Sequence, residues 1–253
     1  MKNIPNLFTL LNLFFGCLAV IFILQNGIAI MTGDEGVQYV GIPERIGIAS
    51  LFIGLAGLVD FLDGLVARLF KATSPMGKQL DSLADVVSFG VAPGMILYQL
   101  LRMSYARQSN GLDTNVLLFL PALLIPCAAA YRLAKFNLDD SQQYGFKGVP
   151  TPAAGLLVAS LPLIYWYSNN GRIISLLLDR WVLYGIILVL VWLQVSNLPL
   201  MAFKFKDYSL KSNFPKLLLL VLAVISAIFL KWLAVPVIFI FYIIVSLATK
   251  KAG

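Results

Sequence analysis

The sequence predicts an all-α polytopic membrane protein with a single transmembrane domain, residues 1–253. Apolar side chains make up 60% of the 253 residues and charged ones only 12%. The mean hydropathy of +0.87 is far above that of a soluble domain. Apolar stretches of near-spanning length fill most of the chain and leave only short loops, so no separate soluble domain is expected.

Eight apolar stretches are candidates for membrane-spanning helices. They cover residues 7–25, 46–70, 81–101, 116–136, 152–168, 181–201, 215–231 and 233–248. The first follows Met1, Lys2 and Asn3 without a small-residue cleavage site, so we expect a retained helix instead of a signal peptide. The last two are short for a helix that crosses about 30 Å of hydrocarbon, and only Lys231 and Trp232 separate them. They predict a helical hairpin, and the expected total is six to eight helices.

The basic residues indicate how the chain is oriented. With the N-terminus in the cytoplasm and eight crossings, thirteen of the 19 Lys and Arg residues fall on the inner side and six on the outer side. This distribution follows the positive-inside bias. The formal charge of +7 indicates contact with anionic lipid headgroups. Nucleic acid is not expected as a partner, because the basic residues end apolar segments and do not alternate with aromatic residues on a polar face.

The residue types present limit the possible chemistry. Histidine is absent, which removes imidazole as a general base or metal ligand. Cys17 and Cys127 lie far apart within apolar runs and indicate neither a disulfide framework nor a metal site. Acid–base chemistry must therefore depend on carboxylates, Lys, Tyr or water.

Four aspartates interrupt the apolar pattern within a short stretch. Asp60 and Asp63 lie three residues apart, and Asp81 and Asp85 four apart, so each pair shares one face of a helix. An antiparallel pair of helices would direct all four carboxylates into a shared space. A carboxylate at membrane depth costs several kcal/mol unless a cation pairs with it, which favours a functional role for this cluster.

The clustered carboxylates predict a divalent-metal site. Without cations, four such groups would repel one another strongly. Their ligand atoms are all oxygen, which favours Mg²⁺ or Mn²⁺ over Zn²⁺. Two such ions would hold a pyrophosphate group and neutralise the charge on its leaving part. The main alternative at this level is a proton or cation pathway in a transporter.

Small and basic residues accompany the acids. Gly64 and Ala67 lie on the face of the first acidic pair and leave room for a planar group, and Arg68 offers a bidentate clamp for phosphate. The Ser-Pro pair at residues 74–75 predicts a turn and the start of the next helix, on which Gly77 opens the facing surface. Close packing between transmembrane helices would also explain the glycines and the alanine, but it would not explain the aspartates.

The spacing resembles the signature of the CDP-alcohol phosphotransferase family. It reads Asp60-x2-Asp63-Gly64-x2-Ala67-Arg68-x8-Gly77-x3-Asp81-x3-Asp85, and all eight specified positions match. The resemblance implies a membrane enzyme that cleaves a CDP-linked alcohol, passes the phosphoryl-bearing group to a hydroxyl and releases CMP. It also implies a homodimer, a divalent-metal site and a six-helix catalytic core, here about residues 1–201, followed by C-terminal helices at about 215–248.

The same resemblance implies a role for each residue of the motif. The metal ligands would be Asp60, Asp63, Asp81 and Asp85. Asp85 is also the favoured catalytic base for the acceptor hydroxyl. The contacts to CDP and its pyrophosphate would be Gly64, Ala67, Arg68 and Gly77.

Three further segments resemble the integral-membrane phosphatidylserine synthases. They are residues 4–16, 131–137 and 146–154. This resemblance implies CDP-diacylglycerol and L-serine as substrates, in a bacterial inner membrane with the active site facing the cytoplasm. Glycerol 3-phosphate or an inositol phosphate remains open as the acceptor. Direct transfer is favoured, and a ping-pong path through a lipidated aspartate remains open.

An amino-acid acceptor requires a cation for its carboxylate near the metals. Arg132, Lys135 and Lys147 are expected on the inner side, and Asn137 or Asp139 would meet the ammonium group. The alternative for Arg132 and Lys135 is that they snorkel at the end of a spanning helix.

The first helix carries a polar face of its own, formed by Pro5, Asn6, Thr9 and Asn12. Amide groups that face lipid are unfavourable, so these side chains are expected to point inward. There they would either satisfy helix contacts or touch the nucleotide.

Overall fold

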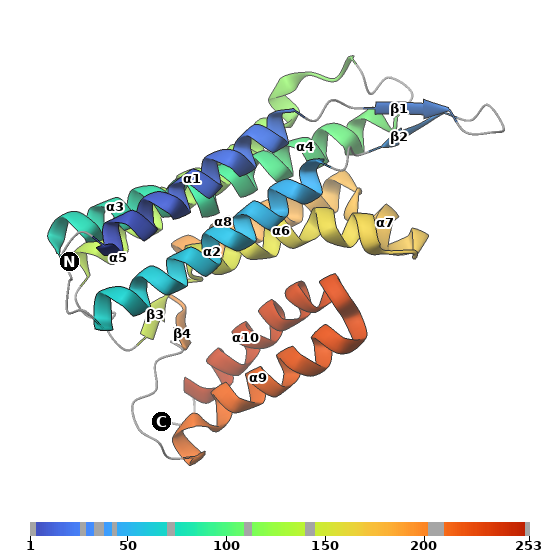
Figure 1. The fold of residues 1–253 in the computed structure, drawn as a ribbon. Coiled ribbons are helices and arrows are strands. Elements are labelled where there is room, and N and C mark those ends of the chain that lie inside the picture. Colours follow the sequence, from blue (N-terminus) through green and yellow to red (C-terminus); the bar gives the residue numbers. More distant parts are fainter. Residues whose placement is uncertain are drawn as a thin grey trace.

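Long helices that run side by side form most of the molecule, and the first helix begins at the end of the bundle where the last one finishes (Figure 1). The computed structural model describes residues 4–25, 29–32, 38–41, 45–69, 74–108, 113–139, 145–201 and 210–250. The α-helices are α1 (Ile4–Leu24), α2 (Arg45–Leu69), α3 (Pro75–Asp85), α4 (Ala92–Ala106), α5 (Leu124–Leu138), α6 (Thr151–Tyr167), α7 (Gly171–Leu177), α8 (Arg180–Val195), α9 (Leu210–Leu230) and α10 (Ala234–Lys250). Short π or 3₁₀ segments are η1 (Val86–Val91), η3 (Val116–Leu118), η4 (Leu120–Leu123) and η6 (Lys231–Leu233). The strands are β1 (Ala29–Thr32), β2 (Gln38–Gly41), β3 (Gly145–Lys147) and β4 (Pro199–Met201).

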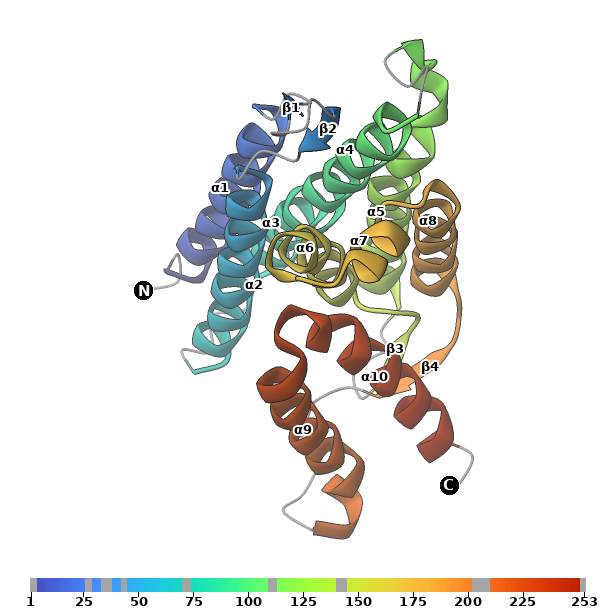
Figure 2. The ribbon, with the colours of Figure 1, turned by 90° about the vertical axis from the view of Figure 1, so that its right-hand side faces the viewer.

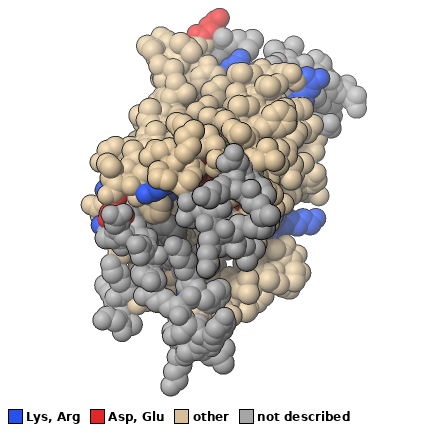
Figure 3. All heavy atoms as spheres, turned by 60° about the vertical axis from the view of Figure 1, so that its left-hand side comes forward, with Lys and Arg blue, Asp and Glu red and all other residues tan. Residues whose placement is uncertain are grey.

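Four helical stretches among the described residues are long and apolar enough to cross a membrane. They are Pro5–Leu24, Arg45–Val66, Pro75–Ala106 and Asn213–Thr249. The bent pair α7 and α8 makes a fifth if it forms one span, and α6 is apolar but shorter. Among the described residues on the face shown in Figure 3, charged side chains are few and scattered. The helices confirm the predicted all-α class, while eight spans stay a prediction.

The helix that carries Asp85 runs from α3 through the π-helical η1 into α4. Its middle leaves almost no space to the neighbouring helices. A Cβ on Gly16 of α1 would lie 2.9 Å from Cα of Ser88, and one on Gly155 of α6 would lie 2.9 Å from Cα of Phe89. Small residues at these two crossings let the backbones approach closely. They therefore fix the position of the segment that directly follows Asp85.

A short antiparallel strand pair ties the loop before α6 to the chain after α8. In its register Gly145 of β3 lies opposite Met201 of β4. Gly148 follows β3 with a φ of 78°, and a Cβ there would lie 2.7 Å from the carbonyl oxygen of Gln194. Glycine is required at this position, because it tolerates both the left-handed conformation and the close approach. The loop is thereby held against the C-terminal end of α8.

Helices α9 and α10 form the predicted C-terminal hairpin, which lies along one side of the bundle (Figures 1 and 2). Helix α9 ends at Leu230, and the next residue, Lys231, has a left-handed φ of 51°, a conformation that commonly ends a helix. After η6 the chain returns as α10, which packs against α6 and β4.

Four described elements lie where the sequence predicts only loops. The strand pair β1–β2 falls within residues 25–44, and β3 and α7 each lie between two predicted spans. Four-residue strands and a seven-residue helix are too short to show a periodic pattern in the sequence.

Candidate metal and substrate site

Three aspartates converge at one end of the bundle. Asp60 and Asp63 of α2 and Asp81 of α3 each offer one carboxylate oxygen, and these oxygens all lie within 4.8 Å of one another. Helix α1 packs against both α2 and α3 and forms the back of the cluster. The structure thus brings together three of the four carboxylates that the sequence predicts to share one space, and α1 contacts both helices that carry them.

The start of α3 is set by its cap. The hydroxyl oxygen of Ser74 accepts a hydrogen bond of 3.0 Å from the backbone N–H of Gly77, and Pro75 occupies the first turn. This start places Asp81 and Asp85 one turn apart on the same face of the helix. The predicted start of a helix at residues 74–75 is confirmed.

Polar side chains of α1 bind two of the four carboxylates. The Thr9 hydroxyl donates to Oδ2 of Asp63 at 2.8 Å, and the side-chain amide of Asn12 donates to Oδ1 of Asp85 at 3.2 Å. Thr9 is 3% exposed and Asn12 is 0% exposed. The polar face of the first helix therefore makes helix contacts to the acidic residues, which the sequence left open. The signal was a Thr and an Asn three residues apart within an apolar span.

Asp85 lies outside the three-carboxylate cluster but close to it. Its side chain is 5% exposed and interacts electrostatically with Asp60 and Asp81. The hydrogen bond from Asn12 fixes one of its oxygens. Asp85 is thus oriented by α1, one helical turn further into the bundle than Asp81.

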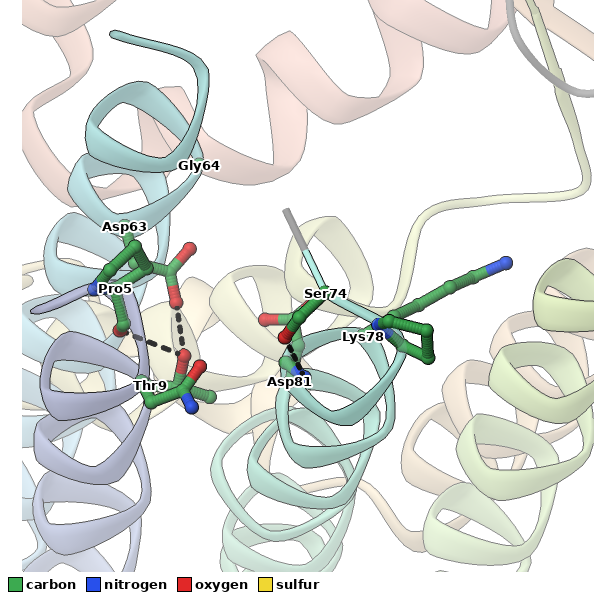
Figure 4. A pocket seen from close by; sticks show the side chains of 10 residues that line it. Pro5, Thr9, Asp63, Gly64, Ser74, Lys78 and Asp81 are labelled. Carbon is green, nitrogen blue, oxygen red and sulfur yellow. Dashed lines mark hydrogen bonds between the residues drawn. The ribbon is translucent and has the colours of Figure 1, made fainter. Parts of the chain in front are cut away.

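A pocket of about 590 Å³ opens beside the cluster (Figure 4). Its lining residues are Pro5, Asn6, Thr9, Asp63, Gly64, Ser74, Pro75, Gly77, Lys78 and Asp81. In Figure 4 the side chain of Lys78 points away from the carboxylates, and its ammonium group donates to the carbonyl oxygen of Asn137 at 2.9 Å. The size suits a small-molecule site.

The two glycines of the motif have different surroundings. Among the described residues, no atom lies within 4 Å of a Cβ placed on Gly64, whereas a Cβ on Gly77 would lie 3.1 Å from both Asn6 Oδ1 and Ser74 Oγ. Packing against described residues therefore explains Gly77 but not Gly64, which lines the pocket. The side chains of Ala67 and Arg68 lie outside what the structure describes.

The donor set fits a divalent cation. Every ligand atom of the cluster is a carboxylate oxygen. Oδ1 of Asp81 is buried and has no hydrogen-bond partner among the described residues. Three close carboxylates with a buried oxygen left over match the preference of hard cations for oxygen ligands. Asp60, Asp63 and Asp81 can therefore hold a divalent metal.

The predicted acceptor residue Arg132 is buried. Its side chain is 6% exposed, so it does not snorkel to the surface. The guanidinium donates from Nη1 to the Thr151 hydroxyl oxygen at 3.3 Å and lies 5.6 Å from the ring centre of Phe136. It also interacts electrostatically with Asp85. Helices α5 and α6 thus bring a cation towards the acidic site.

The two predicted acceptor lysines bind other partners. The Lys135 ammonium donates to Oδ1 of Asn197 at 2.7 Å. Lys147 forms a 2.7 Å ion pair with Asp139, and its side chain is 44% exposed. Arg132, in contrast, interacts electrostatically with Asp85 of the motif.

An apolar helical bundle that gathers carboxylates at one end is a membrane protein with a cation-dependent site, either for catalysis or for transport. Sequence comparison decides between these classes. Residues 2–193 match the CDP-alcohol phosphatidyltransferase family, and the chain belongs to this family. It is therefore an integral membrane enzyme, and the predicted resemblance is confirmed.

Several relatives carry the name CDP-diacylglycerol–serine O-phosphatidyltransferase. The one from Helicobacter pylori (strain ATCC 700392 / 26695) is 32% identical over 231 residues, which are 90% of this chain and 81% of that protein. The one from Bacillus subtilis (strain 168) is 39% identical over 123 residues, 46% of this chain and 61% of that protein. The one from Saccharomyces cerevisiae (strain ATCC 204508 / S288c) is 37% identical over 131 residues, 48% of this chain and 43% of that protein.

Proposed function

We propose that the protein transfers the phosphatidyl group of CDP-diacylglycerol to the hydroxyl of L-serine and releases phosphatidylserine and CMP. The observation that carries this proposal is the buried cation Arg132 within electrostatic reach of Asp85, beside the carboxylate cluster. Serine brings a carboxylate, which needs such a cation close to the reacting centre. The names of the similar proteins from Helicobacter and Bacillus support the same acceptor.

The metal proposed for the site is Mg²⁺ or Mn²⁺, with two ions. Asp60, Asp63 and Asp81 would hold it, and Asp85 would complete the set. When bound, such ions neutralise the charge of the pyrophosphate and of the departing CMP. The oxygen-only donor set supports this choice over zinc.

The chain's own residues orient the acceptor and receive its proton. Arg132 binds the serine carboxylate, which brings the hydroxyl towards Asp85. The serine oxygen then bonds to the phosphorus that carries diacylglycerol, while the bond from that phosphorus to the oxygen bridging to CMP breaks. The hydroxyl proton passes to the Asp85 carboxylate, which Asn12 holds in place through its 3.2 Å hydrogen bond. No protein nucleophile is required, so the transfer is direct.

The donor occupies the pocket beside the cluster. No described residue lies within 4 Å of a Cβ placed on Gly64, so a planar group would approach the α2 backbone there without a clash with the described residues. Asn6 and Ser74 also line this pocket. Gly77, Ala67 and Arg68 complete the proposed contacts to CDP and its pyrophosphate.

The site end of the bundle is proposed to face the cytoplasm of a bacterium, with the helices in the inner membrane among its lipids. The excess of basic residues on that side supports this orientation. We further propose one transmembrane domain, residues 1–253, that acts as a homodimer.

The test is a CMP-release assay with the purified full chain in detergent. CDP-diacylglycerol is supplied with Mg²⁺ or Mn²⁺, and L-serine, glycerol 3-phosphate and an inositol phosphate are compared in parallel. We expect release that depends on serine and stops when a chelator removes the metal. Release with glycerol 3-phosphate or the inositol phosphate, and none with serine, would refute the proposed acceptor.

A further inference from the structure

The C-terminal hairpin is fastened to strand β4 by two side chains of α10. The Tyr242 hydroxyl donates to the carbonyl oxygen of Met201 at 3.0 Å, and the backbone N–H of Met201 donates to the Ser246 hydroxyl oxygen at 3.3 Å. A side-chain hydrogen bond also joins Ser246 to Tyr242. Tyr242 is 7% exposed and Ser246 is 2% exposed. Both backbone groups of Met201 are therefore bound in one buried ring of hydrogen bonds.

Met201 connects this ring to the residues around Arg132. It pairs with Gly145 across the β3–β4 ladder, and β3 leads through the constrained Gly148 to Thr151 at the start of α6. The Thr151 hydroxyl, which is 0% exposed, accepts the hydrogen bond from Arg132. A continuous set of backbone and side-chain contacts thus links α10 to the guanidinium.

Tyr242 also lies within electrostatic range of Arg132. The electrostatic interactions of the guanidinium include Asp85 and Tyr242. Because the single hydroxyl proton of Tyr242 is donated to Met201, its oxygen presents lone pairs to other neighbours. The oxygen of this neutral phenol carries a partial negative charge, which attracts the guanidinium. It does not supply the full negative charge that would neutralise Arg132.

A buried guanidinium is costly unless acceptors surround it. Asp85 supplies a negative charge but is proposed to take up the acceptor's proton. The carboxylate of an amino acid would supply a second charge, in an environment where burial strengthens the interaction. The site is therefore suited to an acceptor that carries its own carboxylate.

We propose that the C-terminal hairpin, which lies outside the matched residues 2–193, completes the acceptor site of this enzyme. Tyr242 is a positioning residue that holds Arg132 for the carboxylate of an amino-acid acceptor, and Ser246 fixes Tyr242. This inference rests on the proposed function, since it concerns the same acceptor.

The test compares three variants of the full chain. Tyr242→Phe removes the hydroxyl and keeps the ring, and Ser246→Ala removes the second contact to Met201. Ser226→Ala is the matched control, because it removes a buried hydroxyl from α9 of the same hairpin. We expect the serine KM to rise about 5- to 20-fold in the first two variants, as loss of one polar contact to a charged group predicts. The kcat and the KM for CDP-diacylglycerol should stay within about twofold of wild type.

A double variant separates positioning from general support. If Tyr242 acts through Arg132, adding Tyr242→Phe to Arg132→Lys should raise the serine KM by less than about twofold beyond Arg132→Lys alone. Full additivity, an unchanged serine KM in both Tyr242→Phe and Ser246→Ala, or an equal rise in the KM for CDP-diacylglycerol would overturn the inference. If Tyr242→Phe does not fold, Ser246→Ala tests the inference alone. A raised serine KM in that variant supports the inference, and an unchanged serine KM overturns it.

The wild-type chain distinguishes this failure from that of the proposed function. Absence of serine-dependent CMP release in wild type would refute the acceptor itself, and with it the amino-acid site. Serine-dependent release in wild type with unchanged KM in the variants would refute only the role of the hairpin.

Discussion

The donor and acceptor halves of the proposed site are built in different ways. The donor half takes its carboxylates from neighbouring helices, Asp60 and Asp63 on α2 and Asp81 on α3. The acceptor half joins Arg132 of α5, Thr151 of α6 and Tyr242 of α10, which are far apart in the sequence. Helical periodicity alone therefore aligns most of the donor half, whereas the acceptor half exists only because distant segments pack together.

The halves also differ in what their residues do. Close carboxylates require cations, so the donor half depends on charge and metal. The acceptor half depends on the orientation of one buried guanidinium by uncharged partners. Substitutions should accordingly abolish turnover in the first half and change the affinity for the acceptor in the second.

The largest effect is expected at the carboxylate cluster. Asp81→Asn replaces a proposed metal ligand by a neutral amide. The change should lower kcat by ~10³-fold or more, because several kcal/mol of charge stabilisation are lost. The measurement is metal-dependent CMP release, with melting in detergent as the check on folding. Asp113→Asn is the control, since Asp113 is exposed and lies far from α2 and α3 in the sequence. More than a tenth of wild-type turnover in Asp81→Asn would contradict the metal assignment.

A smaller effect, confined to the acceptor, is expected at Arg132. Arg132→Lys keeps the charge but loses the planar fork, and should raise the serine KM about 10- to 100-fold while the KM for CDP-diacylglycerol changes little. Lys135→Ala and Lys147→Ala serve as comparisons, because their ammonium groups bind Asn197 and Asp139. If either lysine variant raised the serine KM as much as Arg132→Lys does, the acceptor site would extend towards the loop before α6. Unchanged serine kinetics in Arg132→Lys would move the site away from α5.

The smallest effects should distinguish the two glycines of the motif. Gly64→Ala adds a methyl group with no described atom within 4 Å, so the helix should gain about 0.5–1 kcal/mol. The same change should raise the KM for CDP-diacylglycerol several-fold if the donor approaches α2 there. Gly77→Ala meets Asn6 and Ser74 at 3.1 Å and should lose about 1 kcal/mol of stability. Thermal unfolding in detergent and donor kinetics measure both effects, and a Gly64→Ala variant with unchanged donor KM would place the nucleotide elsewhere.

Much of the donor half follows from the sequence because its determinants are local. The spacing of three and four residues predicts which aspartates share a face, and the Ser-Pro pair predicts where α3 begins. The absence of histidine, with oxygen as the only ligand atom, predicts a hard divalent cation. The hydropathy pattern predicts the apolar helices and the C-terminal hairpin. All of these depend on backbone geometry or composition, which the sequence contains directly.

Only the tertiary structure decided how α1 and α10 contribute side chains around the proposed site. Thr9 and Asn12 bind carboxylates on other helices, and Tyr242 reaches the surroundings of Arg132 through Met201. No sequence spacing encodes these contacts, because they join segments separated by many residues and depend on how whole helices pack. Gly64 and Gly77 also show what the sequence does not contain. Both are glycines on helices of the motif, and only the tertiary structure shows which side chains lie next to each one. The sequence by itself determined the clustered carboxylates and the helices that carry them, whereas packing between distant helices determined which side chains orient those carboxylates.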